Sequence, residues 1–91
     1  MRNITPTKES LEFIRALEPK QFKQVMSKVL GLLVEPRPAD SSDLKGYADM
    51  FRTDIGEYRI VYRFDETSVF VLLVAKRNDD EVYKKLSRKK L

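Results

Sequence analysis

The sequence contains no cysteine and no histidine. Without cysteine the chain cannot form a disulfide or a thiolate metal site, which suits a protein of the reducing cytosol. Without histidine it lacks the usual general base, the commonest metal ligand and the usual pH switch. Any catalysis must therefore use lysine, arginine, tyrosine, aspartate or glutamate, and we predict neither a metal nor another cofactor.

Long apolar segments are missing as well. Ile4 is the one apolar residue between Asn3 and Pro6, so we predict no signal peptide at the N-terminus. The longest apolar run, Val69–Ala75, is too short to span a bilayer. We therefore expect a cytoplasmic protein without a membrane partner.

The chain has the length of one small domain and a basic charge balance. A chain of 91 residues can bury one core, and no repeat or linker divides it, so residues 1–91 are predicted to form a single domain. Lysine and arginine number 18 against 14 acidic residues, which gives a net charge of +4. This excess favours phosphate-bearing or acidic partners.

The first 17 residues indicate a strand followed by a helix. We predict a short strand around Ile4 that ends at the segment Thr5-Pro6-Thr7. Pro6 at a first helical position, with a threonine cap, would begin a helix that runs to about Leu17. The apolar residues of this helix are spaced three apart and form one stripe: Leu11, Ile14 and Leu17.

A second helix is predicted to begin at Pro19, because Glu18-Pro19 interrupts the first one. Its apolar residues follow the helical i, i+3, i+4 spacing: Phe22, Val25, Met26, Val29, Leu30 and Leu33. Pro36 and Pro38 end this helix and open a polar loop that continues through Ser41-Ser42.

From Met50 the apolar period changes from 3.6 to 2, which predicts strands. Two alternating segments, 50–55 and 58–64, flank Gly56-Glu57, a pair that suits a type II′ hairpin turn. After a turn at 65–67, the segment 68–76 is apolar at nearly every position, as expected for a strand with neighbours on both sides.

The last predicted element is a helix capped by Asn78-Asp79. Acidic residues stand near its beginning and basic residues at its end, in agreement with the helix dipole: Asp80, Glu81, Lys84, Lys85, Arg88, Lys89 and Lys90. The predicted fold class is α+β, with a short N-terminal strand, a two-helix hairpin, a three-stranded antiparallel sheet and a C-terminal helix. We expect the helices to cover one face of the sheet.

The hairpin register predicts two different faces. A turn at Gly56-Glu57 places Asp54 opposite Arg59, and opposed residues point to the same side. The side toward the helices would carry Phe51, Thr53, Ile55, Tyr58, Ile60, Tyr62 and Phe64, and the other side Arg52, Asp54, Arg59, Val61 and Arg63. With Lys76 and Arg77 nearby, the second side is either a phosphate-binding surface or a solvated face with an ordinary Asp54–Arg59 ion pair.

An ordered set of motifs resembles the RelE/ParE toxins of type II toxin–antitoxin systems, most closely the RelE-type members. The set covers almost the whole chain and comprises Leu44-Lys45-Gly46, Phe51-Arg52, the Gly-x-Tyr-Arg-x-x-Tyr pattern of 56–62, Val71–Val74, Lys76-Arg77 and Glu81-Val82-Tyr83. The resemblance implies a RelE-like fold and a cognate antitoxin as partner.

The resemblance also implies a function. RelE-type members are ribosome-dependent endoribonucleases that cut mRNA in the decoding site without a metal, by attack of a ribose 2′-hydroxyl on the adjacent phosphate. ParE-type members inhibit DNA gyrase and do not cut RNA. A third possibility is a protein of this fold that binds its partner but lacks activity.

Carried over position by position, the resemblance assigns roles to five residues. Arg59 would clamp the phosphate, Arg77 would act on the leaving group, and Tyr83 would stack on a base or orient the 2′-hydroxyl. Arg52 matches a further basic position. Asp54 departs from the family, which usually has lysine or arginine there, so it would either serve as general base or repel the phosphate. RNA-backbone contacts are predicted for Lys45, Arg63, Lys76, Lys84 and Lys85, although the basic C-terminal residues also fit a solvated helix end.

Overall fold

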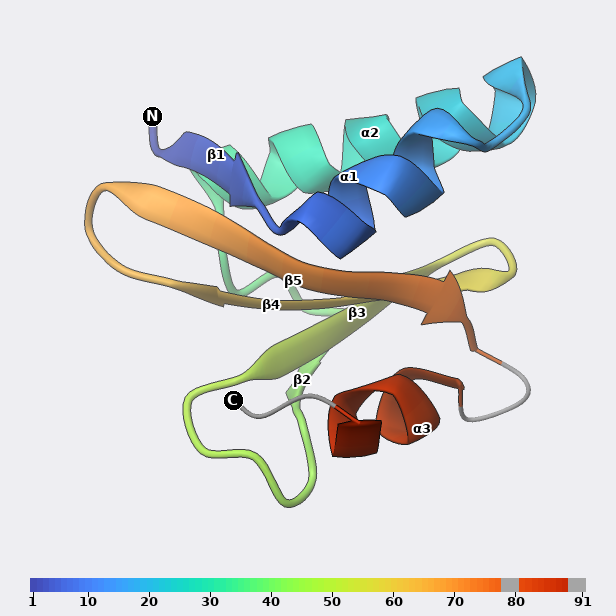
Figure 1. Cartoon of the computed structure of the whole chain (residues 1–91). Helices are drawn as coiled ribbons and strands as arrows, with labels where there is room; N and C mark the ends of the chain where they lie inside the picture. The colour runs from blue at the N-terminus through green and yellow to red at the C-terminus, as the bar shows by residue number, and fades with distance from the viewer. Residues whose placement is uncertain (78–80, 89–91) are drawn as a thin grey trace.

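The computed structural model describes residues 1–77 and 81–88, and its α+β fold agrees with the predicted fold class (Figure 1). One five-stranded sheet has the strand order β1-β5-β4-β3-β2. Helices α1 and α2 lie on one side of this sheet and α3 on the other. The strands are β1 (Asn3–Pro6), β2 (Ser41–Asp43), β3 (Phe51–Ile55), β4 (Tyr58–Phe64) and β5 (Ser68–Lys76), and the helices are α1 (Lys8–Arg15), α2 (Pro19–Val34) and α3 (Glu81–Arg88).

The start of α1 differs from the prediction by two residues. Pro6 belongs to β1, which pairs in parallel with β5, and α1 begins at Lys8. A proline is tolerated there because β1 is an edge strand, where one side of the backbone needs no ladder partner. A threonine does cap the helix, but it follows Pro6 instead of preceding it: the Thr7 hydroxyl accepts a hydrogen bond from the Ser10 amide at 3.1 Å. The same hydroxyl donates to the Leu72 carbonyl at 2.9 Å, which fixes α1 against β5.

Strand β2 was not predicted. Its three residues are all polar, so no alternation distinguishes them from the loop expected at Ser41-Ser42. They nevertheless pair antiparallel with β3, with Ser41 opposite Thr53. Short polar edge strands of this kind protect a sheet from pairing with another chain. Together with β1, this strand extends the predicted three-stranded sheet to five strands.

The β3–β4 hairpin has the predicted register, with Asp54 opposite Arg59 and Ile55 opposite Tyr58. Gly56 has a φ of +57°, and Asp49 is the one non-glycine position with positive φ in the described part of the chain. A left-handed residue at the first central position alone is the geometry of a type II′ turn, so the predicted turn type is confirmed.

A β-bulge explains the long apolar run of β5. Val61 pairs with Leu73 while Tyr62 pairs with Val71, so Leu72 is an extra residue on β5. The bulge changes which side the following residues face, as bulges do. Val71 therefore packs toward α1 and α2, and Leu73 packs toward α3. Burial on both faces accounts for the lack of alternation in this strand.

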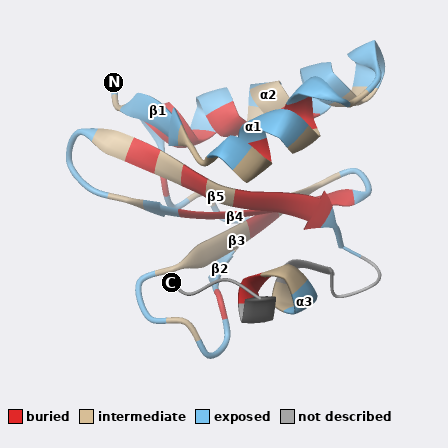
Figure 2. Ribbon diagram, in the orientation of Figure 1, coloured by how far each residue is buried: buried red, intermediate tan, exposed pale blue. Residues whose placement is uncertain are grey.

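The larger core lies between the sheet and the α1–α2 layer, where Figure 2 shows buried residues facing each other. Its buried members are Ile14, Val25, Val29, Leu32, Leu33, Tyr58, Ile60, Tyr62, Val69, Val71 and Val74. Two residues of the predicted apolar stripe of α2 lie outside it, since Phe22 is 41% and Leu30 is 53% exposed.

A second, smaller core corrects the expectation that the helices cover one face only. Helix α3 packs on the opposite face of the sheet, over Val61, Leu73 and Ala75, and contributes the buried side chain of Leu86. Val61, predicted to lie on the charged open face, is fully buried. The arginine-bearing surface is therefore a strip beside α3, not a whole sheet face.

Some predictions fall on residues that the structure does not describe. The expected cap at Asn78-Asp79, the acidic Asp80 and the basic Lys89 and Lys90 lie outside the described residues. In the ranges that are described, no helix combines the length and the apolar character needed to cross a membrane.

Candidate active site: an arginine cluster around Asp54

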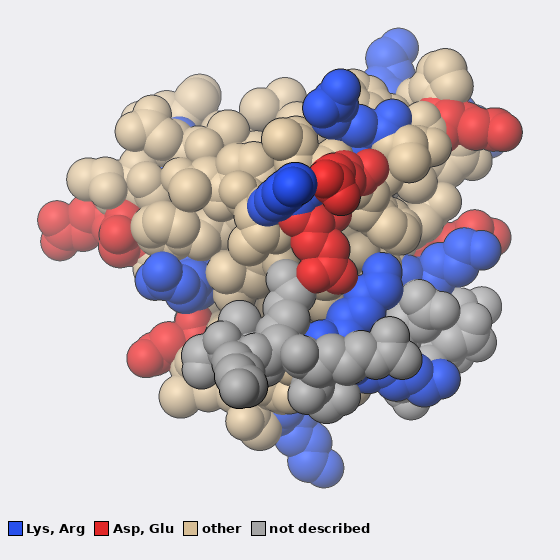
Figure 3. Space-filling view, in the orientation of Figure 1, with Lys and Arg blue, Asp and Glu red and all other residues tan. Residues whose placement is uncertain are grey.

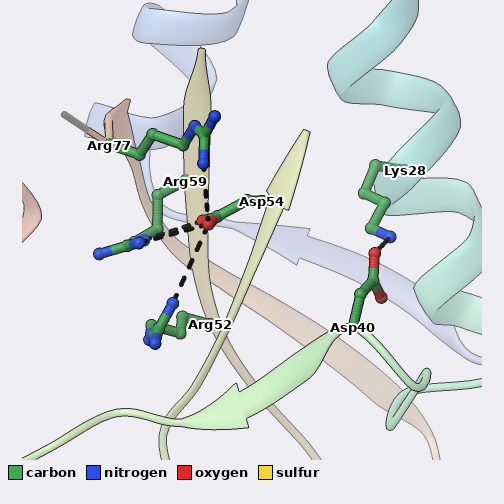
Figure 4. Close-up of polar contacts among 6 residues, drawn as sticks. All are labelled: Lys28, Asp40, Arg52, Asp54, Arg59 and Arg77. Carbon is green, nitrogen blue, oxygen red and sulfur yellow. Dashed lines mark hydrogen bonds and ion pairs between the residues drawn. The ribbon is translucent and has the colours of Figure 1, made fainter. Parts of the chain in front are cut away.

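Three arginines surround one carboxylate on the α3 side of the sheet (Figure 4). Arg59 binds both oxygens of Asp54, with its Nε donating to Oδ1 at 2.8 Å and its Nη2 donating to Oδ2 at 3.3 Å. The second oxygen also lies 3.8 Å from a guanidinium nitrogen of Arg77 and 4.0 Å from one of Arg52. We call these four residues the arginine cluster.

The strand pairing explains why these residues meet. Asp54 and Arg59 are a cross-strand pair, so their side chains share a face. Arg52 stands two residues before Asp54 on β3 and therefore points to the same side. Arg77 directly follows β5, and its backbone N–H donates to the Glu57 carbonyl at 3.0 Å, which holds it beside the hairpin turn.

Burial differs within the arginine cluster. The Arg59 side chain is 15% exposed, whereas Arg77 is 51% exposed at the rim. In the free protein, two hydrogen bonds hold the mostly buried Arg59 guanidinium to its carboxylate. Arg59 is thus the enclosed cation of the cluster, and Arg77 is the exposed one beside it.

The charge of the cluster is positive, because three guanidinium groups face one carboxylate. The face seen in Figure 3 carries interspersed basic and acidic side chains. Convergent guanidinium forks are suited to the oxygens of a phosphate. In the described ranges, no three His, Cys, Asp or Glu side chains are grouped so that they could hold a metal ion.

The predicted residues of α3 take part in packing. Tyr83 is half-buried and packs against the smaller core that contains Val61 and Leu86. Lys84 is exposed, and the Lys85 ammonium lies 5.0 Å from the centre of the Phe13 ring on α1. This cation–π contact joins the two helical layers around the sheet.

The other predicted RNA-contact residues lie apart from one another. The guanidinium of Arg63 stacks over the Phe70 ring at 4.2 Å from its centre. Lys45 is exposed in the loop between β2 and β3, and Lys76 is exposed at the end of β5. The structure therefore brings together Arg52, Asp54, Arg59 and Arg77 and distributes the remaining candidates over the surface.

Two features near the sheet edge were not anticipated from the sequence. The Arg37 guanidinium stacks over the Phe51 ring at 4.3 Å and lies 3.7 Å from the Asp43 carboxylate. Lys28 on α2 forms an ion pair with Asp40 in the loop before β2. Both depend on how this loop folds back on β3, and no local pattern indicates that.

Comparison with known structures identifies the class of protein. The toxin RelE from E. coli, solved in the free state as a double arginine-to-alanine variant, is 26% identical, with a TM-score of 0.78 over 99% of this chain and 98% of that one. The intact E. coli RelBE toxin–antitoxin complex contains a chain that is 28% identical, with a TM-score of 0.72 over 86% and 99%. The RelBE2 complex from Mycobacterium tuberculosis gives 26% identity and a TM-score of 0.71 over 84% and 98%. The fold is that of the RelE/ParE toxins.

The family follows from the sequence. Residues 7–81 match the family model described as ParE toxin of the type II toxin–antitoxin system parDE, and the chain belongs to this family. No curated protein matches the sequence.

Proposed function

We propose that this protein is the toxin of a type II toxin–antitoxin pair and cuts mRNA on the ribosome in the cytoplasm. The observation that carries the proposal is the convergence of Arg52, Arg59 and Arg77 on a single anionic group, within 4.0 Å of its oxygens. The carboxylate of Asp54 stands there where a phosphate would be bound. The likeness to E. coli RelE supports this choice within the family.

The proposed reaction uses no metal. The 2′-oxygen of a ribose forms a bond to the adjacent phosphorus while its proton leaves to water. The bond from phosphorus to the 5′-oxygen breaks, which gives a 2′,3′-cyclic phosphate and a 5′-hydroxyl that takes its proton from water. Arg59 holds the phosphate oxygens and stabilises the charge that develops on them. Arg77, exposed at the rim, is positioned for the departing 5′-oxygen, and Tyr83 orients the substrate. Positioning by the ribosome supplies a further part of the rate.

For Asp54 we propose a positioning role. Both of its oxygens are engaged by guanidinium groups, so it is poorly placed to accept the proton of a 2′-hydroxyl. It keeps three like charges together in the free protein, which would otherwise repel each other. When RNA binds, the phosphate takes over these contacts.

The proposed partners are a cognate antitoxin and the ribosome with mRNA in its decoding site. The support for the antitoxin is that similar chains occur in RelBE complexes from E. coli and M. tuberculosis. Exposed basic residues suit contact with ribosomal RNA backbone: Lys45, Arg63, Lys76 and Lys84.

A cell-free translation reaction with a defined message tests the nuclease. We expect cuts at fixed codon positions that need translating ribosomes and that disappear in Arg59→Ala and Arg77→Ala. Lys8→Ala, an exposed change on α1, serves as the control and should leave the cuts intact. Intact message with wild-type protein, at ribosome-saturating concentration, would contradict the proposal.

The second candidate function is inhibition of DNA gyrase. The family model itself favours it, because its description names the ParE toxins. Asp54 favours it too, since a carboxylate within the cluster lowers the positive charge available to a scissile phosphate. Gyrase cleavage complexes trapped by the protein, together with intact message in the translation assay, would select this function.

A further inference from the structure

A pocket of about 350 Å³ lies at the β2 edge of the sheet, beside the loop that joins β2 to β3 (Figure 1). This volume is at the lower end of the range of roughly 300–1,000 Å³ that small-molecule sites occupy. We call it the edge pocket, and its lining consists of Arg37, Asp43, Tyr47, Ala48, Asp49, Met50 and Phe51. The lining provides two aromatic rings, one guanidinium and two carboxylates, and it shares no residue with the arginine cluster.

One part of this lining is a stack of planar groups. Asp43 and Phe51 are a cross-strand pair, so their side chains share a face of the sheet. The Arg37 guanidinium lies over the Phe51 ring, 4.3 Å from its centre, and 3.7 Å from the Asp43 carboxylate. Because 47% of the Arg37 side chain is exposed, the guanidinium offers its outer face to another planar group.

The other part of the lining comes from the β2–β3 loop. Two backbone hydrogen bonds close this loop, from the Leu44 N–H to the Met50 carbonyl at 2.9 Å and from the Tyr47 N–H to the Leu44 carbonyl at 3.1 Å. They hold Tyr47 and Asp49 beside the pocket. The Asp49 carboxylate forms no ion pair with another residue in the ranges 1–77 and 81–88. The loop therefore brings two unused acceptor oxygens to the edge pocket.

The charges around the edge pocket narrow the class of ligand. The guanidinium of Arg37 already covers the Phe51 ring, so a cationic ligand would meet a like charge at the stacking surface. The carboxylates of Asp43 and Asp49 would repel a phosphate or another anion. A neutral planar molecule that donates hydrogen bonds therefore fits the lining best, and nucleobases stack on guanidinium planes in this way.

The acceptor-only chemistry of a carboxylate selects one base. Ionised aspartate accepts hydrogen bonds and donates none, and its two oxygens can receive a pair of adjacent donors. Guanine presents such a pair on its Watson–Crick edge, N1–H and N2–H. Adenine and cytosine present a donor beside an acceptor there, and uracil presents a single donor between two acceptors. We propose that the edge pocket binds an unpaired guanine base, stacked on Arg37 and donating to Asp49, while Asp43 orients the guanidinium.

This binding site is separate from the proposed nuclease site. Phe51 and Arg52 are neighbours on β3, so their side chains point to opposite faces of the sheet. Phe51 packs toward the α1–α2 layer, whereas Arg52 belongs to the arginine cluster. A guanine in the edge pocket is therefore not the nucleotide held at the cluster. The same recognition applies to a free guanine nucleoside and to an unpaired guanine within an RNA.

Titration of the full chain with guanosine tests the edge pocket. Guanosine carries no phosphate, so it does not compete for the arginine cluster. We expect saturable binding by NMR, with amide shifts concentrated at 37, 43 and 47–51. Adenosine should bind roughly tenfold more weakly or worse, because the bidentate pair to the carboxylate is lost. Inosine, which lacks the N2 amine, should fall between the two.

Three variants separate reading of the base from stacking. Asp49→Asn preserves side-chain size, and asparagine tolerates the left-handed backbone of this position, where φ is +61°. It should abolish the preference for guanosine over adenosine, because an amide offers a donor beside an acceptor. Arg37→Ala should weaken both nucleosides alike. Glu66→Gln neutralises an exposed carboxylate in the β4–β5 turn, outside the pocket, and should leave binding and preference unchanged.

Several results would overturn the inference. Equal binding of guanosine and adenosine would exclude recognition of guanine, and an equal loss of preference in Asp49→Asn and Glu66→Gln would exclude this site. Shifts confined to residues 52, 54, 59 and 77 would place the nucleoside at the arginine cluster instead. No ribosome and no cleavage enters these measurements, so a negative translation assay would leave their result unaffected.

A pair of RNA hairpins identifies the source of the base once guanosine binds. The two differ in one unpaired loop nucleotide, guanine or adenine, so their phosphates contribute equally. A guanine hairpin that binds more tightly than the adenine hairpin, with the difference lost in Asp49→Asn, would support the inference and assign the pocket to RNA. Equal binding of the two hairpins, together with a preference for guanosine, would support it and assign the pocket to a free nucleoside.

Discussion

At the scale of single residues, Asp54 is the shared partner of the three arginines in the cluster. The sequence placed it opposite Arg59, and the structure confirms this pair. The contacts of Arg77 and Arg52 with the same carboxylate were not predictable, because they depend on where the chain leaves β5 and on side-chain conformation. A two-residue turn determines the hairpin register locally. The cluster, in contrast, forms only when β3, β4 and β5 pair side by side.

Replacement of Asp54 distinguishes positioning from base catalysis. We expect single-turnover cleavage by Asp54→Asn to stay within about threefold of wild type over a pH series, because the phosphate replaces the carboxylate in the complex. Loss of a general base would instead reduce the rate by about 10²–10⁴. RNA binding measured without cleavage should tighten in Asp54→Asn, since a negative charge is removed. A hundredfold slower rate with unchanged binding would show that Asp54 is the base.

Tyr62 is a second residue with a testable role, in the larger core. Its hydroxyl donates to the Pro36 carbonyl at 2.6 Å, and burial raises the pKa of this tyrosine above 10.0. The unfolded chain therefore loses the phenol proton at lower pH than the folded chain. The contribution to stability is complete below pH 10 and is lost as pH rises toward the folded pKa.

Tyr62→Phe separates these effects. Near pH 7 we expect unfolding to cost about 1–3 kcal/mol less than in wild type, because the carbonyl loses its partner. Between pH 9 and 11 the free energy of unfolding of the variant should fall less steeply. Urea titrations across this range measure both. Parallel pH profiles for the two proteins would contradict the assignment.

At the scale of elements, the sequence predicts best the helices and strands whose apolar residues recur at a regular spacing. The spacing of α2 and the alternation of β3 and β4 identified those elements, and Pro19 marks the beginning of α2 as predicted. Strand β2 has no periodic signal, and its pairing depends on a long-range partner. The docking of α3 on the second face was missed for a related reason. The bulge at Leu72 sends Leu73 and Ala75 to that face, and a bulge cannot be seen in an apolar run.

Paired leucine substitutions test how firmly α3 is docked. Leu86 is 1% exposed against β5, whereas Leu30 on α2 is 53% exposed. We expect Leu86→Ala to lower the free energy of unfolding by about 2–4 kcal/mol and Leu30→Ala by less than about 1 kcal/mol. Chemical denaturation of both variants provides the measurement. Similar values for the two would mean that α3 contributes no core to this fold.

At the scale of the whole molecule, the α1–α2 layer is joined to the rest of the fold by a few long-range polar contacts. The Lys28–Asp40 ion pair links α2 to the loop before β2, and the Thr7 and Ser10 hydroxyls link α1 to β5. The total charge of +4 follows from composition, but which charges pair across layers follows only from the tertiary fold. Because Lys28 and Asp40 belong to different elements, their ion pair and its pH dependence exist only in the folded chain.

The Lys28–Asp40 pair gives the sign of that pH dependence. The hydrogen bond from Lys28 lowers the pKa of Asp40 below its usual 3.8, against a smaller opposing effect of burial. A carboxyl group with a lowered folded pKa stabilises the fold above the unfolded pKa, and this contribution is lost as pH falls through the folded pKa. Because the Asp40 side chain is 54% exposed, water screens the pair and the effect is at most about 1 kcal/mol.

A double-mutant cycle between pH 2 and 6 measures this contribution. Asp40→Asn should flatten the acid limb of the stability curve, and Lys28→Met should flatten it to a similar extent, because either change removes the interaction. The second substitution should then add little in the presence of the first, since residues that act through one contact are not additive. High salt should reduce the wild-type slope toward that of the variants. Additive effects of the two substitutions would show that α2 and the loop are held together by other contacts.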